Sequence, residues 1–143
     1  MGRVDELFDR YAESHRDPVN KAIHWLCVPL ITWSVLAALW AWSPAAAVAV
    51  IAGAMLFYLR LSRALAAGML AVALVMVSPL PLADSRRALL VGAVVVFVVA
   101  WIGQFIGHHI EGRKPSFVDD VKFLLVGPAW LLASVYRRVG IAY

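Results

Sequence analysis

Three long stretches without charged side chains constrain what this chain can fold into. No Asp, Glu, Lys or Arg occurs from Trp25 to Leu59, a run of 35 residues. Uncharged runs of 20 residues follow from Ala64 to Ala83 and from Ala88 to Gly107. A helix needs about 20 apolar residues to cross a bilayer core, so the longest run is too long for one span and suits two. Ser43-Pro44 near its middle supplies the turn, because proline cannot continue a preceding helix.

The composition also favours a membrane domain over a soluble one. Of the 143 residues, 63% are hydrophobic and 15% are charged, whereas a soluble domain is about half apolar and about one quarter charged. A globule of this size has too little interior to bury such an excess. We therefore predict a single all-α integral membrane domain over residues 1–143. It is expected to be a four-helix bundle whose spans cover approximately residues 24–42, 45–60, 64–83 and 88–109.

Both ends of the chain predict helices that differ from the spans. Residues 3–14 place apolar side chains at helical spacing and charges around the other face, which is typical of an amphipathic helix on the membrane surface or over the bundle. Asp17-Pro18 then favours a helix start, with Asp at the cap and Pro at the first position. Near the other end, residues 116–119 resemble a capping box. The apolar run 123–136 is short and holds Gly127-Pro128, so we predict a kinked interfacial or re-entrant helix.

The basic residues predict the orientation. With four spans, the amino-terminal segment, the Arg60–Arg63 turn and the Glu111–Lys122 segment share one side of the membrane, and nine Lys and Arg residues fall there. The positive-inside rule makes that side cytoplasmic, in the inner membrane of a bacterium or the endoplasmic reticulum of a eukaryote. These charges flank apolar runs, so we expect membrane lipid and no nucleic acid as a partner. Small residues such as Gly53, Ala54, Gly68 and Gly92 would allow close helix contacts in a homo-oligomer.

All four histidines fall at the predicted cytoplasmic ends of the helices: His15, His24, His108 and His109. A lone histidine at a membrane interface is usually an ordinary amphipathic residue. Four at one depth favour a metal site, because neutral imidazole is the commonest side-chain ligand for iron, zinc and copper. The residues alone do not decide between iron and zinc.

Several polar neighbours are candidates for a further ligand or for orienting the imidazoles: His109, Glu111, Asn20, Gln104 and Asp119. Gln104 and Glu111 lie one helical turn before and after His108, on the same face. For Glu111 and Asp119 the alternative is a solvated helix end or a cap.

Two other functions fit the same histidines. A pair such as His24 and His108 could hold a b-type haem. Alternatively, the protein is a non-catalytic membrane scaffold or lipid-binding protein whose histidines are only interfacial. Hydrolase and nucleotide-binding motifs such as GxSxG, HExxH or a P-loop do not occur in the sequence.

Two sequence blocks carry a family resemblance. The first is His15-Arg-Asp-Pro-Val-Asn20-Lys-Ala-Ile-His24, followed by Val28-Pro29, and the second runs from Gln104-Phe-Ile-Gly-His108 through Glu111 and Pro115 to Asp119. Together they resemble the small membrane iron(II)-dependent 2-hydroxy fatty acid dioxygenases, a former domain-of-unknown-function family that acts in phytosphingosine breakdown. Asp17 replaces the family's usual asparagine, and the interval from His108 to Glu111 is one residue shorter than in its eukaryotic version.

The resemblance implies a cofactor, a substrate and roles for individual residues. Iron(II) would be held by His15, His24 and His108, with His109 as a candidate extra ligand. The substrates would be O2 and a long-chain 2-hydroxy fatty acid, which is shortened by one carbon in α-oxidation, a step of sphingolipid and fatty acid metabolism. Cationic side chains would attract the substrate carboxylate: Arg16, Arg113 and Lys114.

Overall fold

The computed structural model describes residues 3–115, 118 and 122–143, and these residues form helices and no strands. The helices are α1 (Arg3–Ala12), α2 (Pro18–Trp42), α3 (Pro44–Leu61), α4 (Arg63–Val77), α5 (Arg86–Glu111) and α6 (Phe123–Val139), with a short 3-10 turn, η1 (Leu80–Leu82), after α4. The all-α prediction is confirmed. The predicted capping box at residues 116–119 lies mostly outside the described residues.

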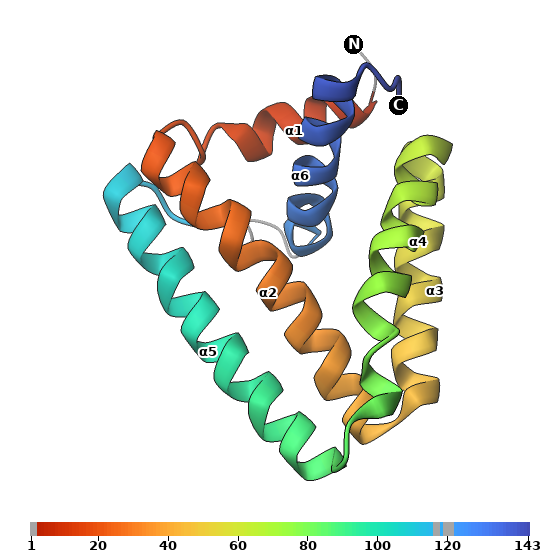
Figure 1. The fold of residues 1–143 in the computed structure, drawn as a ribbon. Helices are drawn as coiled ribbons and strands as arrows, with labels where there is room; N and C mark the ends of the chain where they lie inside the picture. Colours follow the sequence, from red (N-terminus) through yellow and green to blue (C-terminus); the bar gives the residue numbers. More distant parts are fainter. Residues whose placement is uncertain (1–2, 116–117, 119–121) are drawn as a thin grey trace.

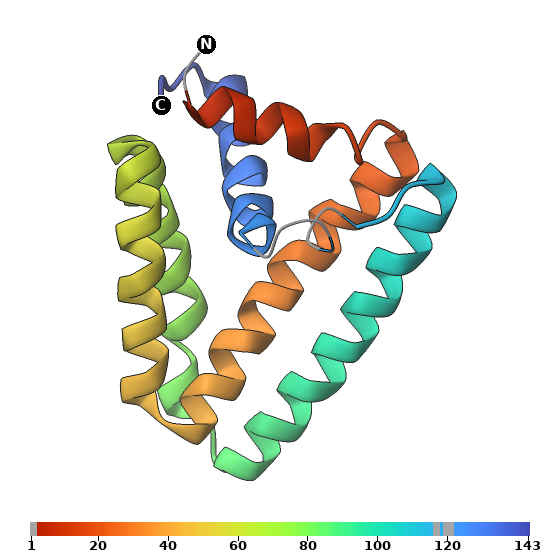
Figure 2. The ribbon, with the colours of Figure 1, turned by 180° about the vertical axis from the view of Figure 1, so that it is seen from behind.

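The four long helices form two pairs arranged as a wedge. Helices α2 and α5 run side by side, as do α3 and α4, and the pairs meet where α2 turns into α3 (Figures 1 and 2). Toward the other end the pairs diverge, and α6 lies between them, in contact with both α2 and α4. Helix α1 crosses this wide end of the wedge, where both chain termini also lie.

Polar residues define the helix ends closely. Asp17 caps α2 by accepting hydrogen bonds from the backbone N–H groups of Val19 and Asn20, so the helix begins at Pro18, and the helix start predicted at Asp17-Pro18 is confirmed. Serines cap the next three helices with their hydroxyl groups: Ser43, Ser62 and Ser85. The turn predicted at Ser43-Pro44 is present, because Ser43 ends α2 and Pro44 begins α3.

Two glycines let α5 approach α2 closely. A Cβ atom at Gly103 would lie 2.7 Å from the sulfur of Cys27, and one at Gly107 would lie 2.4 Å from Oδ1 of Asn20. Both distances are shorter than a van der Waals contact, so a side chain at either position would force the neighbouring group or helix to shift. Small residues of this kind allow close packing between helices in a membrane, and here they bring together the histidines that the two helices carry.

Helix α6 is the centre of the main apolar core. Its buried side chains include Phe123, Val126 and Leu131, and they pack against residues of α1, α3 and α4. The hydroxyl of Tyr58 in α3 donates to the carbonyl oxygen of Leu125 (2.9 Å). Helix α6 begins inside the wedge at Phe123 and ends near α1 at the wide end (Figure 1).

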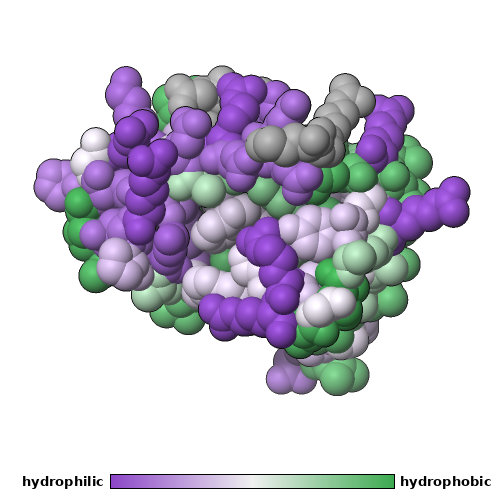
Figure 3. All heavy atoms as spheres, turned by 90° about the horizontal axis from the view of Figure 1, so that it is seen from above, coloured by the Kyte–Doolittle hydropathy of each residue, from purple (hydrophilic) through white to green (hydrophobic). Residues whose placement is uncertain are grey.

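Four helical segments are long and apolar enough to cross a membrane: Pro18–Trp42, Pro44–Leu61, Arg63–Leu82 and Arg86–Glu111. These are the four predicted spans, and the protein is therefore a membrane protein by the length and composition of its helices. The amphipathic α1, the α3–α4 turn and the end of α5 all lie at the wide end of the wedge (Figure 1). Viewed from that end, hydrophilic side chains gather over the surface (Figure 3). Of the glycines expected at a helix contact, Gly68 faces Tyr136 of the same chain, whereas the space around Gly53 and Gly92 is open.

Candidate metal centre

Three histidines from three separate segments meet at the wide end of the wedge. His15 follows α1, His24 lies in the second turn of α2, and His108 lies in the last turn of α5. Their ring centroids are 4.2 Å apart for His15 and His24, 4.8 Å for His24 and His108, and 5.0 Å for His15 and His108. One ring nitrogen from each lies within 4.8 Å of the others, and all three side chains are buried.

Backbone carbonyl groups one helical turn earlier orient two of the rings. Nδ1 of His15 donates to the carbonyl oxygen of Tyr11 (2.6 Å), and Nδ1 of His24 donates to that of Asn20 (2.9 Å). A carbonyl oxygen only accepts, so Nδ1 carries the proton and Nε2 keeps the lone pair in both rings. This is the arrangement that commonly supports metal-binding histidines in proteins.

The site keeps ring nitrogens without protein partners. Nε2 of His15 and Nδ1 of His108 are buried and make no hydrogen bond within the described residues. Burial lowers the pKa of His15 to about 4, and the nearby His108 lowers it as well, against the opposing effect of the Tyr11 hydrogen bond. The His15 ring is therefore neutral at physiological pH. Buried neutral imidazoles with free lone pairs are suitable ligands for a divalent transition metal. The three histidines therefore fit the metal ion that the sequence predicts.

Glu111, at the end of α5, holds the segment that carries His15 through hydrogen bonds. Its carboxylate accepts hydrogen bonds from the backbone N–H groups of Arg16 (2.9 Å) and Asp17 (2.7 Å), and from Nδ2 of Asn20 (3.2 Å). Nδ2 of Asn20 also donates to the carbonyl oxygen of Ser14 (3.1 Å). Both carboxylate oxygens of Glu111 are therefore engaged with the His15 segment, which suits an orienting role better than that of a further ligand.

The other predicted residues divide by position. Gln104 is buried and lines the cavity beside the histidines. His109 is exposed and is not part of the three-histidine group, because neighbours on a helix point about 100° apart. Arg16, Arg113 and Lys114 are exposed as well, and Asp119 lies outside the described residues.

Tyr11 was not predicted as a site residue. Its ring stacks on that of His15 with centroids 4.2 Å apart and an interplanar angle of 15°, and its side chain lines the same cavity. A spacing in the sequence could have indicated Tyr11 as a site residue. Tyr11, Asn20 and Gln104 each precede a histidine of the cluster by four residues, which is about one turn of a helix.

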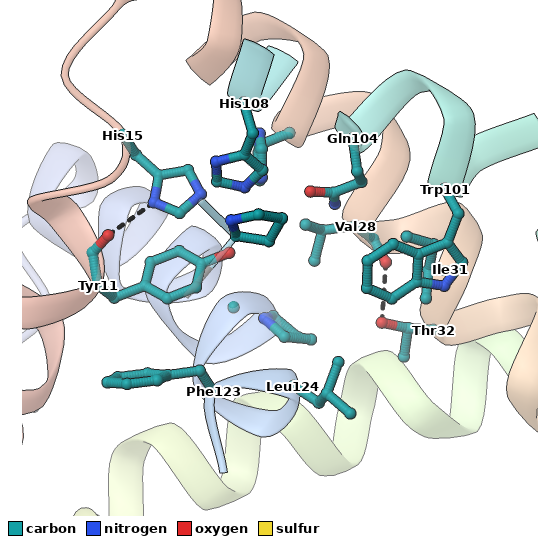
Figure 4. A pocket seen from close by; sticks show the side chains of 14 residues that line it. Tyr11, His15, Val28, Ile31, Thr32, Trp101, Gln104, His108, Phe123 and Leu124 are labelled. Atoms are coloured by element: carbon teal, nitrogen blue, oxygen red, sulfur yellow. Dashed lines mark hydrogen bonds between the residues drawn. The ribbon is translucent and has the colours of Figure 1, made fainter. Parts of the chain in front are cut away.

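The histidines open into a cavity of about 50 Å³ with one polar and one apolar side. In Figure 4, His15 and His108 lie together on one side with the Tyr11 hydroxyl near them, and Trp101, Ile31 and Thr32 lie on the other. Gln104 lies between the two sides. The spacing of the rings argues against the haem alternative, since the ring centroids of His24 and His108 are 4.8 Å apart and a porphyrin ring does not fit between them.

Comparison with known proteins identifies the family. Residues 1–139 match the sequence profile of the family described as "2-hydroxy-palmitic acid dioxygenase Mpo1-like". The chain belongs to the Mpo1-like family. It is 30% identical over 137 residues to the 2-hydroxy-palmitic acid dioxygenase MPO1 of Saccharomyces cerevisiae, an alignment that covers 91% of this chain and 78% of the yeast protein. No solved structure matches this chain.

Membership of the Mpo1-like family confirms the resemblance drawn from the two histidine-bearing blocks. The match extends over nearly the whole chain, so it includes all three histidines of the cluster. The family contains a protein named as a dioxygenase, and the three-histidine group offers the kind of site that could bind a metal.

Proposed function

We propose that this protein is an iron(II)-dependent dioxygenase that shortens 2-hydroxy fatty acids by one carbon. The observation that carries the proposal is the buried group of His15, His24 and His108, which opens into a partly apolar cavity inside a membrane domain. Membership of the Mpo1-like family supports it. The relative's name specifies a 2-hydroxy acid and dioxygenase chemistry.

In this proposal, His15, His24 and His108 hold iron(II), which supplies the redox chemistry that lets O2 react with the substrate. Three protein ligands leave room for the carboxylate and 2-hydroxyl oxygens of a 2-hydroxy acid. The side chains of Gln104 and Tyr11 line the cavity beside the histidines. An amide and a phenol hydroxyl can each donate a hydrogen bond to such oxygens, so we assign these two groups to orienting them.

The overall reaction breaks the C1–C2 bond of the substrate. One 2-hydroxy acid and one O2 give the acid that is one carbon shorter, together with CO2 and water, so atoms and electrons balance without a further co-substrate. The exposed cations Arg16, Arg113 and Lys114 would attract the carboxylate as the substrate approaches the polar end. Such attraction between exposed charges is weakened by salt.

We also propose that the histidine site faces the cytoplasm, in a bacterial inner membrane or in the endoplasmic reticulum of a eukaryote. The basic segments of the chain lie at the same end of the wedge as the histidines, and the positive-inside rule places that end in the cytoplasm. Accessibility labelling of Cys introduced at exposed positions of each end would test this orientation.

The proposed activity is tested with purified protein loaded with iron(II) under anaerobic conditions. Addition of O2 and 2-hydroxypalmitate should yield the one-carbon-shorter acid, detected by mass spectrometry. His15→Ala, His24→Ala or His108→Ala should abolish turnover, whereas the matched control His109→Ala, next to the site but exposed, should retain it. Absence of turnover by the iron-loaded wild type with any 2-hydroxy acid, or full activity in two of the three cluster variants, would contradict the proposal and favour a lipid-binding scaffold.

A further inference from the structure

A second, larger cavity lies in the wedge between the two helix pairs. Its volume is about 360 Å³, and side chains of α2, α3, α4, α5 and α6 line it. The lining is almost entirely apolar. The hydroxyl groups that reach it are already engaged, since Thr32 donates to the carbonyl oxygen of Val28 (2.9 Å) and Tyr58 donates to that of Leu125 (2.9 Å). The cavity therefore mainly offers burial to an apolar group.

This cavity adjoins the one at the histidines, because the two share part of their lining. Five residues line both: Ile31, Thr32, Trp101, Leu124 and Pro128. Figure 4 shows four of these side chains along the side of the small cavity away from His15. A ligand with a polar head at the histidines would therefore have the larger, apolar space next to it for its remaining length.

The distance from the histidines to the far end of the larger cavity matches a long alkyl chain. On α2 the deepest lining residue, Leu36, lies 12 residues beyond His24, which is about 18 Å along a helix. On α5 the deepest, Phe97, lies 11 residues before His108, or about 17 Å. One leaflet of a bilayer core is about 15 Å thick, which is the length of an ordinary membrane acyl chain.

We propose that this cavity holds the alkyl tail of a long-chain 2-hydroxy acid whose head lies at the histidines, and that Ala54 and Ala73 set how long that tail can be. The proposal rests on the proposed function for the identity of the head. The small size of the histidine cavity, about 50 Å³, favours a free 2-hydroxy acid over a glycerolipid, whose headgroup is far larger than two oxygen atoms on adjacent carbons.

Ala54 and Ala73 line the middle of the larger cavity from α3 and α4. Ala54 lies one helical turn from Val50 at the deep end and one turn from Tyr58 nearer the polar end, and Ala73 lies one turn from both Met69 and Met76. A leucine at either position would fill the space that the distal part of the tail occupies. Each methylene group excluded from apolar burial costs about fourfold in affinity.

The first experiment compares kcat/KM for 2-hydroxypalmitate and 2-hydroxylaurate. Ala54→Leu and Ala73→Leu should lower the ratio of kcat/KM for 2-hydroxypalmitate to kcat/KM for 2-hydroxylaurate by more than about tenfold. The reason is that about four methylene groups of the longer substrate can no longer be buried in the cavity. The matched control Ala52→Leu lies on the same helix as Ala54 but on its exposed face, outside the cavity lining, and should leave the ratio unchanged. Turnover with the same chain-length profile in both cavity variants and the control would overturn the tail assignment and leave the proposed function intact.

The second experiment does not need turnover. A 2-hydroxypalmitate probe with a diazirine at its terminal carbon is photolysed with metal-free protein in detergent, and the labelled residues are mapped by mass spectrometry. Label should fall on the deep lining residues Val50, Met76 and Phe97, and it should decrease in Ala54→Leu but not in Ala52→Leu. Label confined to exposed, lipid-facing positions would overturn the assignment. Deep label without turnover of any 2-hydroxy acid would support the cavity as an alkyl site while contradicting the proposed function.

Discussion

A single methyl group added at position 107 should disrupt the histidine site through helix packing. Gly107 lies in α5 directly before His108, and a Cβ atom there would lie 2.4 Å from Oδ1 of Asn20. The amide of Asn20 cannot move aside freely, because it is fully buried and its Nδ2 donates to Ser14 and Glu111. Gly107→Ala therefore forces α2 away from α5, and the accompanying shift of the Asn20 amide breaks both hydrogen bonds.

The expected cost follows from these contacts. Overpacking a close helix contact costs about 1–3 kcal/mol. Loss of two hydrogen bonds, one of them to a carboxylate, adds about 2–4 kcal/mol, and the better helix propensity of alanine offsets about 1 kcal/mol. The net destabilisation is about 2–6 kcal/mol, which corresponds to a Tm lower by about 5–20 °C for a chain of this size. Metal affinity should fall as well, because the carbonyl group of Asn20 orients His24.

The assay is thermal unfolding in detergent, followed by tryptophan fluorescence, together with a metal titration. Gly92→Ala is the matched control, since Gly92 lies in the same helix and a Cβ atom there would have no neighbour within 4 Å. This control should keep the wild-type Tm or raise it slightly. Equal Tm and equal metal affinity for the two variants would refute the packing argument for Gly107.

Three further predictions concern the groups around the histidines. Glu111→Ala should lower metal affinity by about 10–100-fold, because the His15 segment loses its hydrogen bonds to the end of α5. The control Glu13→Ala, at an exposed position, should not change the affinity. Equal affinities for the two variants would show that Glu111 does not position the site. Tyr11→Phe should leave metal affinity near that of the wild type and lower kcat for the 2-hydroxy acid, and an unchanged kcat would remove the hydroxyl from the proposed chemistry. Because burial lowers the pKa of His15 to about 4 from an ordinary 6.5, the unfolded chain takes up a proton that the folded chain does not as pH falls from 6.5 toward 4. The Tm of the metal-free protein should therefore fall as the pH is lowered over that range, and the dependence of Tm on pH should be weaker in His15→Gln. The same dependence in both proteins would contradict the effect assigned to the burial of His15.

Much of this architecture could be predicted from local patterns. Uncharged runs of about the length of a bilayer core give the spans, and Ser43-Pro44 gives the turn between the first two. Counting spans also places His15, His24 and His108 at one end of the molecule, which is where the structure brings them together.

The positions that could not be predicted depend on how separate segments pack. Glu111 accepts hydrogen bonds from residues more than 90 positions earlier, and nothing in its own neighbourhood indicates that partner. The family resemblance names His108 as a ligand, but the residues alone leave both His108 and His109 open, because the choice depends on which face of α5 meets α2. That face is marked by small residues, Ala100, Gly103 and Gly107, so the pattern of small residues was the signal that could have selected His108.

Metal content tests most directly whether His15, His24 and His108 form one metal site. Protein purified in detergent is reconstituted anaerobically with iron(II), freed of excess metal and measured by elemental mass spectrometry, for wild type, His24→Ala and His109→Ala. We predict about one iron per chain in wild type and His109→Ala, and little or none in His24→Ala. No iron in the wild type, or equal iron in the wild type and His24→Ala, would contradict the assignment of the three histidines as ligands.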